Sequence, residues 1–83
     1  MNSPEETLRE TILALLAARA PGKTICPSEA ARKAFPNEWR DRMEATRQVA
    51  ITLATAGKLE ICQGGKAIKS QQFSGPVRLR KPQ

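Results

Sequence analysis

The sequence has no histidine and no tyrosine, and it has only two cysteines and three aromatic residues. Without histidine, a four-ligand zinc site would have only two thiolates to draw on, so we expect no metal site. Histidine is also the commonest general base in enzymes, and no other acid–base cluster in the sequence replaces it. A chain of 83 residues is also too small for a convincing cofactor cavity. We therefore expect neither an enzyme nor a cofactor-binding protein.

Long hydrophobic runs are missing too. The apolar run over residues 12–18 is too short to span a bilayer, and three acids, Glu5, Glu6 and Glu10, precede it where a secretory signal would be basic. Cys26 and Cys62 form no C-x-x-C pair, and a single distant pair does not resemble a secreted disulfide framework. We expect free thiols, no membrane association and a cytoplasmic location.

Acidic residues are absent from the last quarter of the chain. The net charge is +6, but residues 1–60 carry nine basic and eight acidic side chains. Residues 61–83 carry no acid, and their basic residues are Lys66, Lys69, Arg78, Arg80 and Lys81. The positive field is therefore predicted to belong mainly to this C-terminal quarter.

Capping signals and apolar spacing predict three helices, over residues 4–19, 27–34 and 38–56. The first begins with Ser3-Pro4 and an acid at Glu6, as in a capping box. The second ends before Phe35-Pro36, since a residue before proline is pushed out of helical geometry. Gly57 suits the C-cap of the third helix.

Helical periodicity also predicts which side chains are buried. In the first helix one apolar face contains Leu8, Ile12, Leu15 and Leu16. In the third helix the buried face is predicted to hold Trp39, Met43, Thr46, Val49, Ala50, Leu53 and Ala54, while the other side presents Arg40, Glu44, Arg47, Gln48 and Ile51. An equal alternative for that polar side is a solvated surface with intrahelical ion pairs.

Alternating apolar and polar residues predict short strands over residues 23–25 and 59–63, and over 66–69 and/or 77–80. Gly64-Gly65 is a hairpin signal between residues 59–63 and 66–69. The strand over 59–63 is predicted to pair antiparallel with 66–69 or with 77–80. The expected fold is one α+β domain over residues 1–83, a winged helix-turn-helix of three helices with a small antiparallel sheet.

Four stretches carry a closer resemblance: residues 24–32, 35–40, 56–60 and 75–80. Their clearest elements are Cys26-Pro27-Ser28, Phe35-Pro36 and Trp39-Arg40. Together they resemble a small bacterial family of uncharacterised winged-helix-like domains, over nearly the whole chain. Where that family tends to read valine-aspartate-proline after the glycine turn, this chain has Ile68-Lys69-Ser70, which makes the wing more basic. The resemblance implies a winged helix and, by analogy of fold, nucleic-acid binding.

The leading hypothesis is a nucleic-acid-binding module, for DNA more than for RNA, in which the wing and last strand supply phosphate contacts. The candidate contact residues are Arg40, Arg47, Gln48, Lys66, Lys69, Arg78 and Arg80. The alternative is a protein-interaction module without nucleic-acid activity, because the third helix is balanced in charge. Trp39 is expected to be a core or lid residue, or else an anchor for a partner protein.

Overall fold

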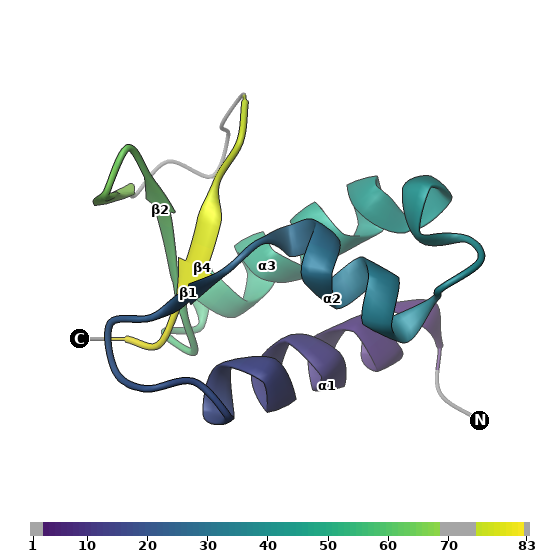
Figure 1. Ribbon diagram of the computed structural model, residues 1–83, viewed down its shortest axis with the longest axis horizontal. Coiled ribbons are helices and arrows are strands. Elements are labelled where there is room, and N and C mark those ends of the chain that lie inside the picture. The colour runs from purple at the N-terminus through teal and green to yellow at the C-terminus, as the bar shows by residue number, and fades with distance from the viewer. Residues whose placement is uncertain (1–2, 69–74, 83) are drawn as a thin grey trace.

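The structure is a computed structural model that describes residues 3–68 and 75–82. In chain order its elements are α1 (Pro4–Ala17), β1 (Thr24–Ile25), α2 (Pro27–Ala34), the 3-10 helix η1 (Trp39–Arg42), α3 (Met43–Thr55), β2 (Glu60–Gln63), β3 (Lys66–Ile68) and β4 (Arg78–Arg80). The predicted α+β class is confirmed, and the arrangement is consistent with a winged helix. Figure 1 shows α1 and α2 in front of α3, with the strands gathered at the C-terminal end of α3.

The first helix begins as its capping signal predicts. The Glu6 backbone N–H donates to Ser3 Oγ over 3.1 Å, and Pro4 occupies the first helical turn. The helix ends at Ala17, two residues before the predicted end. There the Arg19 N–H donates to the Leu16 carbonyl in a tighter i→i+3 bond, and the chain then turns at Gly22, whose φ of 84° is left-handed.

The predicted helix over residues 38–56 is wrong in its first part. Pro36 follows the end of α2. The backbone then forms two i→i+3 hydrogen bonds, from the Glu38 N–H to the Phe35 carbonyl and from the Asp41 N–H to the Glu38 carbonyl, each 3.0 Å long. No side chain caps the start of η1 or of α3. Regular α-helical bonding therefore starts only at Met43, after a separate 3-10 turn.

The end of α3 is a Schellman motif. The Lys58 N–H donates to the Leu53 carbonyl over 2.9 Å, and the Gly57 N–H donates to the Ala54 carbonyl over 3.0 Å. Gly57 has a φ of 77°, which a residue with a β-carbon adopts only at a cost. This glycine is the C-cap that the sequence predicts, and it turns the chain from α3 into the sheet.

The four strands form one antiparallel sheet in the order β1-β4-β2-β3. β2 lies between β4 and β3, so both alternatives predicted for its pairing occur together. Gln63 pairs with Lys66 across Gly64 and Gly65, whose φ values of 61° and 83° are those of a two-residue hairpin turn. β1 pairs with β4, which makes the short segment after α1 an edge strand.

The core lies between the helices and the inner face of the sheet. Leu79 of β4 is fully buried and stands opposite Ile25 of β1 and Ile61 of β2. The helices contribute Leu8, Ile12 and Leu16 of α1, Ala30 of α2, and Val49, Ala50 and Leu53 of α3. The buried face predicted for the third helix is confirmed at Thr46, Val49, Ala50 and Leu53, whereas Trp39, Met43 and Ala54 are half-buried. The buried Thr46 hydroxyl donates to the Arg42 carbonyl over 2.7 Å, so its polar group is satisfied.

We expect Leu53→Ala to lower the free energy of unfolding by about 2–5 kcal/mol, as truncation of a buried leucine does. Leu53 is 2% exposed and belongs to the core cluster. Urea titration followed by circular dichroism would measure the loss, with the exposed Thr55→Ala as the control on the same helix. A loss below about 0.5 kcal/mol, the range usual for surface changes, would contradict the burial of Leu53.

Candidate nucleic-acid interface

The predicted contact residues are spread over four elements of the fold. Arg40 belongs to η1, Arg47 and Gln48 to α3, Lys66 to β3, and Arg78 and Arg80 to β4, while Lys69 lies outside the described residues. Arg40, Gln48, Lys66 and Arg78 are exposed, and Arg47 and Arg80 are half-buried. The structure does not bring these residues together as one patch, because η1 and β3 lie at opposite ends of α3 (Figure 1).

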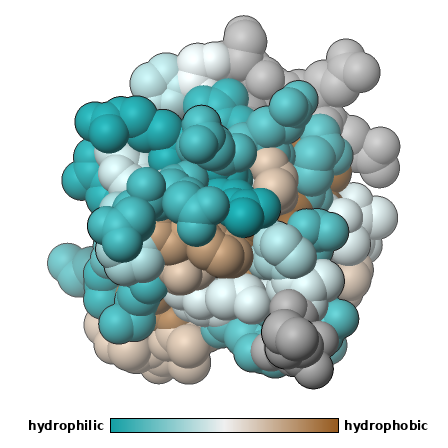
Figure 2. All heavy atoms as spheres, turned by 90° about the vertical axis from the view of Figure 1, so that its right-hand side faces the viewer, coloured by the Kyte–Doolittle hydropathy of each residue, from teal (hydrophilic) through white to brown (hydrophobic). Residues whose placement is uncertain are grey.

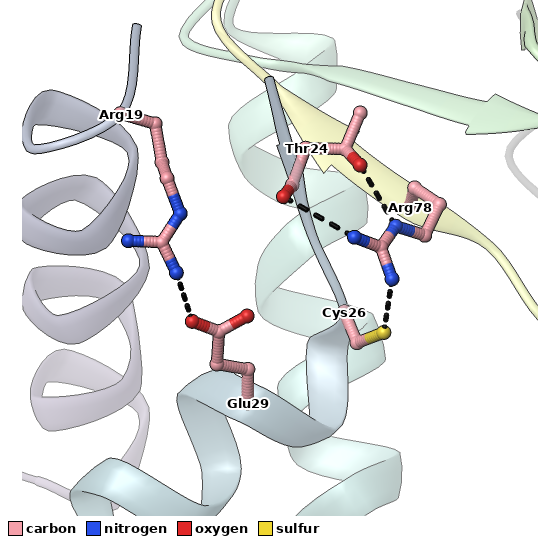
Figure 3. A network of polar contacts seen from close by, with 5 residues as sticks. All are labelled: Arg19, Thr24, Cys26, Glu29 and Arg78. Carbon is pink, nitrogen blue, oxygen red and sulfur yellow. Dashed lines mark hydrogen bonds and ion pairs between the residues drawn. The ribbon is translucent and has the colours of Figure 1, made fainter.

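Arg78 connects three segments of the chain. Its Nε donates to Thr24 Oγ1 over 2.8 Å, Nη2 donates to the Thr24 carbonyl over 3.3 Å, and Nη1 donates to Cys26 Sγ. Figure 3 shows the guanidinium reaching from β4 to β1 and to the first residue before α2. A side chain with three protein acceptors is less available to a phosphate, although Arg78 itself is exposed.

Arg80 has a carboxylate partner on the neighbouring strand. Its Nε donates to Glu60 Oε1 over 2.7 Å, and the two residues stand directly opposite each other in the β2–β4 register. This hydrogen bond raises the pKa of Arg80. The pair is half-buried, with 20% and 28% of the two side chains exposed, so solvent screens it only in part. Arg80 therefore adds little free positive charge to the surface.

A second ion pair holds the helices. Arg19, just after α1, donates through Nη2 to Glu29 Oε2 in the first turn of α2, as Figure 3 also shows. Because Glu29 lies at the positive end of the α2 dipole, its charge is favourable there even without Arg19. The contact joins the end of α1 to the start of α2 and involves none of the predicted contact residues.

The residues around η1 form an arginine–aromatic cluster, of which only Arg40 was among the predicted nucleic-acid contacts. The Arg32 guanidinium of α2 lies 4.2 Å from the centre of the Trp39 ring, and that of Arg40 lies 4.5 Å from it. Both arginines are exposed, and among the described residues no carboxylate pairs with either of them. Figure 2 shows this end of the molecule, with hydrophilic side chains above a smaller hydrophobic area.

A neighbouring arginine, Arg42, packs against Phe35 and pairs with Glu38. Arg42 lies over the Phe35 ring at 4.7 Å, and its Nη2 is 3.6 Å from Glu38 Oε2. Its Nε is buried without a partner in the part of the chain that the structure describes. Glu38 thus neutralises Arg42 and leaves Arg32 and Arg40 as the unpaired cations of the cluster.

Gln48 lies in a different setting from Arg47. It lines a groove between α3 and the first turns of α1, together with Glu5, Glu6 and Arg9. Carboxylates beside Gln48 would repel the phosphates of a duplex at close range. Within α3, Gln48 therefore lines an acidic groove and Arg47 does not, although helical spacing places both on the polar side of the helix.

Arg32 was not among the contact residues that the sequence predicted. Its partner ring is seven residues away, across the Phe35-Pro36 break, so no helical spacing links the two. A compositional signal was present: aromatic residues interleaved with arginines at residues 32–42. The stack itself follows from the turn made by η1, which only the folded chain shows.

The two thiols are free and differ in their surroundings. Cys62 is buried, and this burial raises the pKa of its thiol, whereas Cys26 is half-exposed beside Arg78. The described residues contain no group of three or more histidine, cysteine, aspartate or glutamate side chains able to hold an ion. No helix in residues 3–68 or 75–82 is long and apolar enough to cross a membrane.

The model of a family described as "Protein of unknown function (DUF3253)" matches residues 5–82. The chain belongs to this family. The match runs from the first turn of α1 past the end of β4, so it covers every helix and strand of the DUF3253 domain except the first residue of α1. No curated protein matches the chain. Membership in DUF3253 carries no chemistry with it, and the function of the DUF3253 chain rests on its own side chains.

We expect Cys26 of the DUF3253 chain to react with a thiol reagent faster than Cys62. The thiolate is the reactive form, and Cys62 is only 3% exposed with a raised pKa. Mass spectrometry of Cys26→Ser and Cys62→Ser variants, labelled at neutral pH, would give each rate separately. As pH rises past the unfolded-state pKa of a thiol, Cys62 should destabilise the fold, because the unfolded chain then loses its proton first. Equal labelling rates in the folded protein would contradict the burial.

Proposed function

We propose that this domain binds nucleic acid, with Arg32 and Arg40 as its main phosphate contacts. The observation that carries the proposal is the pair of exposed guanidinium groups over one tryptophan ring, immediately before α3. Neither group has a carboxylate partner among the described residues, so their donors remain available. Guanidinium groups match phosphate oxygens through two parallel hydrogen bonds.

The ring of Trp39 prepares both arginines for binding. A cation–π contact at an exposed site is worth about 0.5–1 kcal/mol, and a free arginine side chain has about 2 kcal/mol of rotamer entropy to lose. Holding the guanidiniums in place before binding therefore removes part of that cost. The ring faces are occupied by arginine, which favours phosphate contact over base stacking as the role of this cluster.

The position of the cluster relative to α3 supports a duplex target. α3 has 13 residues and is therefore about 20 Å long. Lys66 is exposed and belongs to β3, which lies at the other end of α3 from η1 (Figure 1). A duplex running along α3 would therefore meet cations near both ends of the helix. We favour DNA, because the major groove of B-DNA admits an α-helix whereas that of A-form RNA is too narrow.

The proposal gives the two arginines of β4 a structural role. Arg78 holds Thr24 and Cys26, and Arg80 is paired with Glu60. The phosphate contacts then come from α2, η1 and the hairpin more than from the C-terminal strand. Because α3 also carries Glu44 at its exposed N-terminal end, affinity should be modest and strongly dependent on salt.

We expect Arg32→Ala and Arg40→Ala each to weaken duplex binding about fivefold to tenfold at low salt, or about 1–1.4 kcal/mol. Each should also reduce the slope of log affinity against log salt by about 0.9, because one phosphate contact is lost. Fluorescence anisotropy across a salt series measures both quantities. The control is Lys23→Ala, an exposed cation outside the cluster. Loss of affinity in the control alone would contradict the role of Arg32 and Arg40. No binding by the folded wild type to DNA or RNA would leave the protein-interaction alternative.

We expect Trp39→Leu to weaken duplex binding about threefold and to leave the slope of log affinity against log salt unchanged. That slope depends on the number of phosphates neutralised, and both arginines keep their charges in this variant. The ring acts by positioning Arg32 and Arg40, which lie over it at 4.2 and 4.5 Å. The same anisotropy series tests this, with a thermal melt to confirm that the half-buried position tolerates leucine. A slope that falls as far as in the arginine variants would contradict a positioning role.

A further inference from the structure

A second surface lies on another side of α3 from Arg47. It is a groove of about 250 Å³ between the first turns of α1 and the middle of α3. Its floor is formed by Val49 and Leu53, which also belong to the core and are 8% and 2% exposed. Its rim is formed by exposed side chains, chiefly Glu5, Glu6 and Arg9 of α1 and Gln48 of α3.

The size and charge of the groove limit what can occupy it. Pockets for small molecules usually have about 300–1,000 Å³, which is more than this open groove offers. Two carboxylates on the rim disfavour a phosphate backbone. An apolar floor with a charged rim is instead the anatomy of a protein–protein contact that receives one or two anchor side chains.

We propose that this groove docks an amphipathic helix of a partner protein whose apolar face is flanked by lysine or arginine. Val49 and Leu53 are four residues apart on α3, which places them about 6 Å apart along its axis. Apolar side chains at positions i and i+4 of a second helix have the same spacing. A helix lying along the groove therefore sets its two anchors over the two floor residues.

Charge complementarity selects a basic flank for the docked helix. The rim carries Glu5 and Glu6 against a single cation, Arg9, in a chain whose net charge is +6. Glu6 is partly engaged with Ser3, whose hydroxyl lies 3.5 Å from its Oε1. Among the described residues no side chain pairs with the Glu5 carboxylate, which leaves it available to a lysine or arginine of the partner.

The test uses the full chain, labelled with nitrogen-15, and a helical probe peptide about 14 residues long. The peptide carries leucine at two positions i and i+4, with lysine beside them, and a second peptide carries glutamate in place of lysine. We expect the lysine peptide to shift amides of the first turn of α1 and of residues 48–53, and to bind at least about tenfold more tightly than the glutamate peptide.

Two variants and two controls separate docking from general adhesion. Glu5→Lys should weaken the lysine peptide about fivefold, whereas Glu10→Lys changes the same charge outside the groove and should have a smaller effect. Thr52→Trp fills the groove from an exposed position, so it should abolish the shifts without unfolding the core. Arg32→Ala should leave peptide affinity unchanged, which keeps this site distinct from the nucleic-acid proposal.

Three outcomes would overturn the proposal. One is equal affinity for the lysine and glutamate peptides, and another is a shift map centred away from α1 and α3. The third is a concentration-dependent shift of the same amides without peptide, accompanied by dimer in sedimentation, because a second copy of the chain would then cover the groove. A thermal melt of each variant confirms that the comparison is made between folded proteins.

Discussion

The fold depends on the packing of Leu79 between Ile25 and Ile61. These three residues come from the beginning, middle and end of the chain, and the sheet register places Leu79 directly opposite both of the others. All three are buried against the helices. Since side chains alternate between the two faces of a strand, the burial of Leu79 also requires Arg78 and Arg80 to lie on the outer face. A shift of one residue would bury two arginines in the core.

That constraint decides the roles of the two arginines in β4. On the outer face Arg80 stands opposite Glu60, and the guanidinium of Arg78 reaches the edge strand and the start of α2. Counting charges along the sequence places five cations in the last quarter of the chain, without an acid. Folding brings Glu60, which precedes this quarter in the sequence, next to one of these cations, Arg80. Sequence position alone therefore does not show which of these cations has a carboxylate partner.

At η1, folding instead brings cations together. Arg32, Trp39 and Arg40 lie in a stretch of nearly balanced charge, yet the 3-10 turn after Pro36 brings two guanidiniums to one ring. Their neighbour Arg42 forms the ion pair with Glu38, so this carboxylate is not paired with Arg32 or Arg40. On the side of α3 next to α1, the rim of the groove carries an excess of acid. The arginine pair at Trp39 and the acidic rim of the groove are the features on which the nucleic-acid and peptide-docking proposals rest.

The sequence by itself determined the local elements, because their signals are short-range. The cap at Ser3, the break at Phe35-Pro36, the glycine C-cap at Gly57 and the hairpin at Gly64-Gly65 each depend on residues within one turn of each other. The apolar face of α3 followed from spacing alone. Only the tertiary structure decided which strands pair, that α3 begins at Met43, and which cations are left without carboxylates. Those outcomes depend on contacts between residues 7 to 54 positions apart, such as Arg32 with Trp39 and Arg78 with Thr24, which no local pattern encodes.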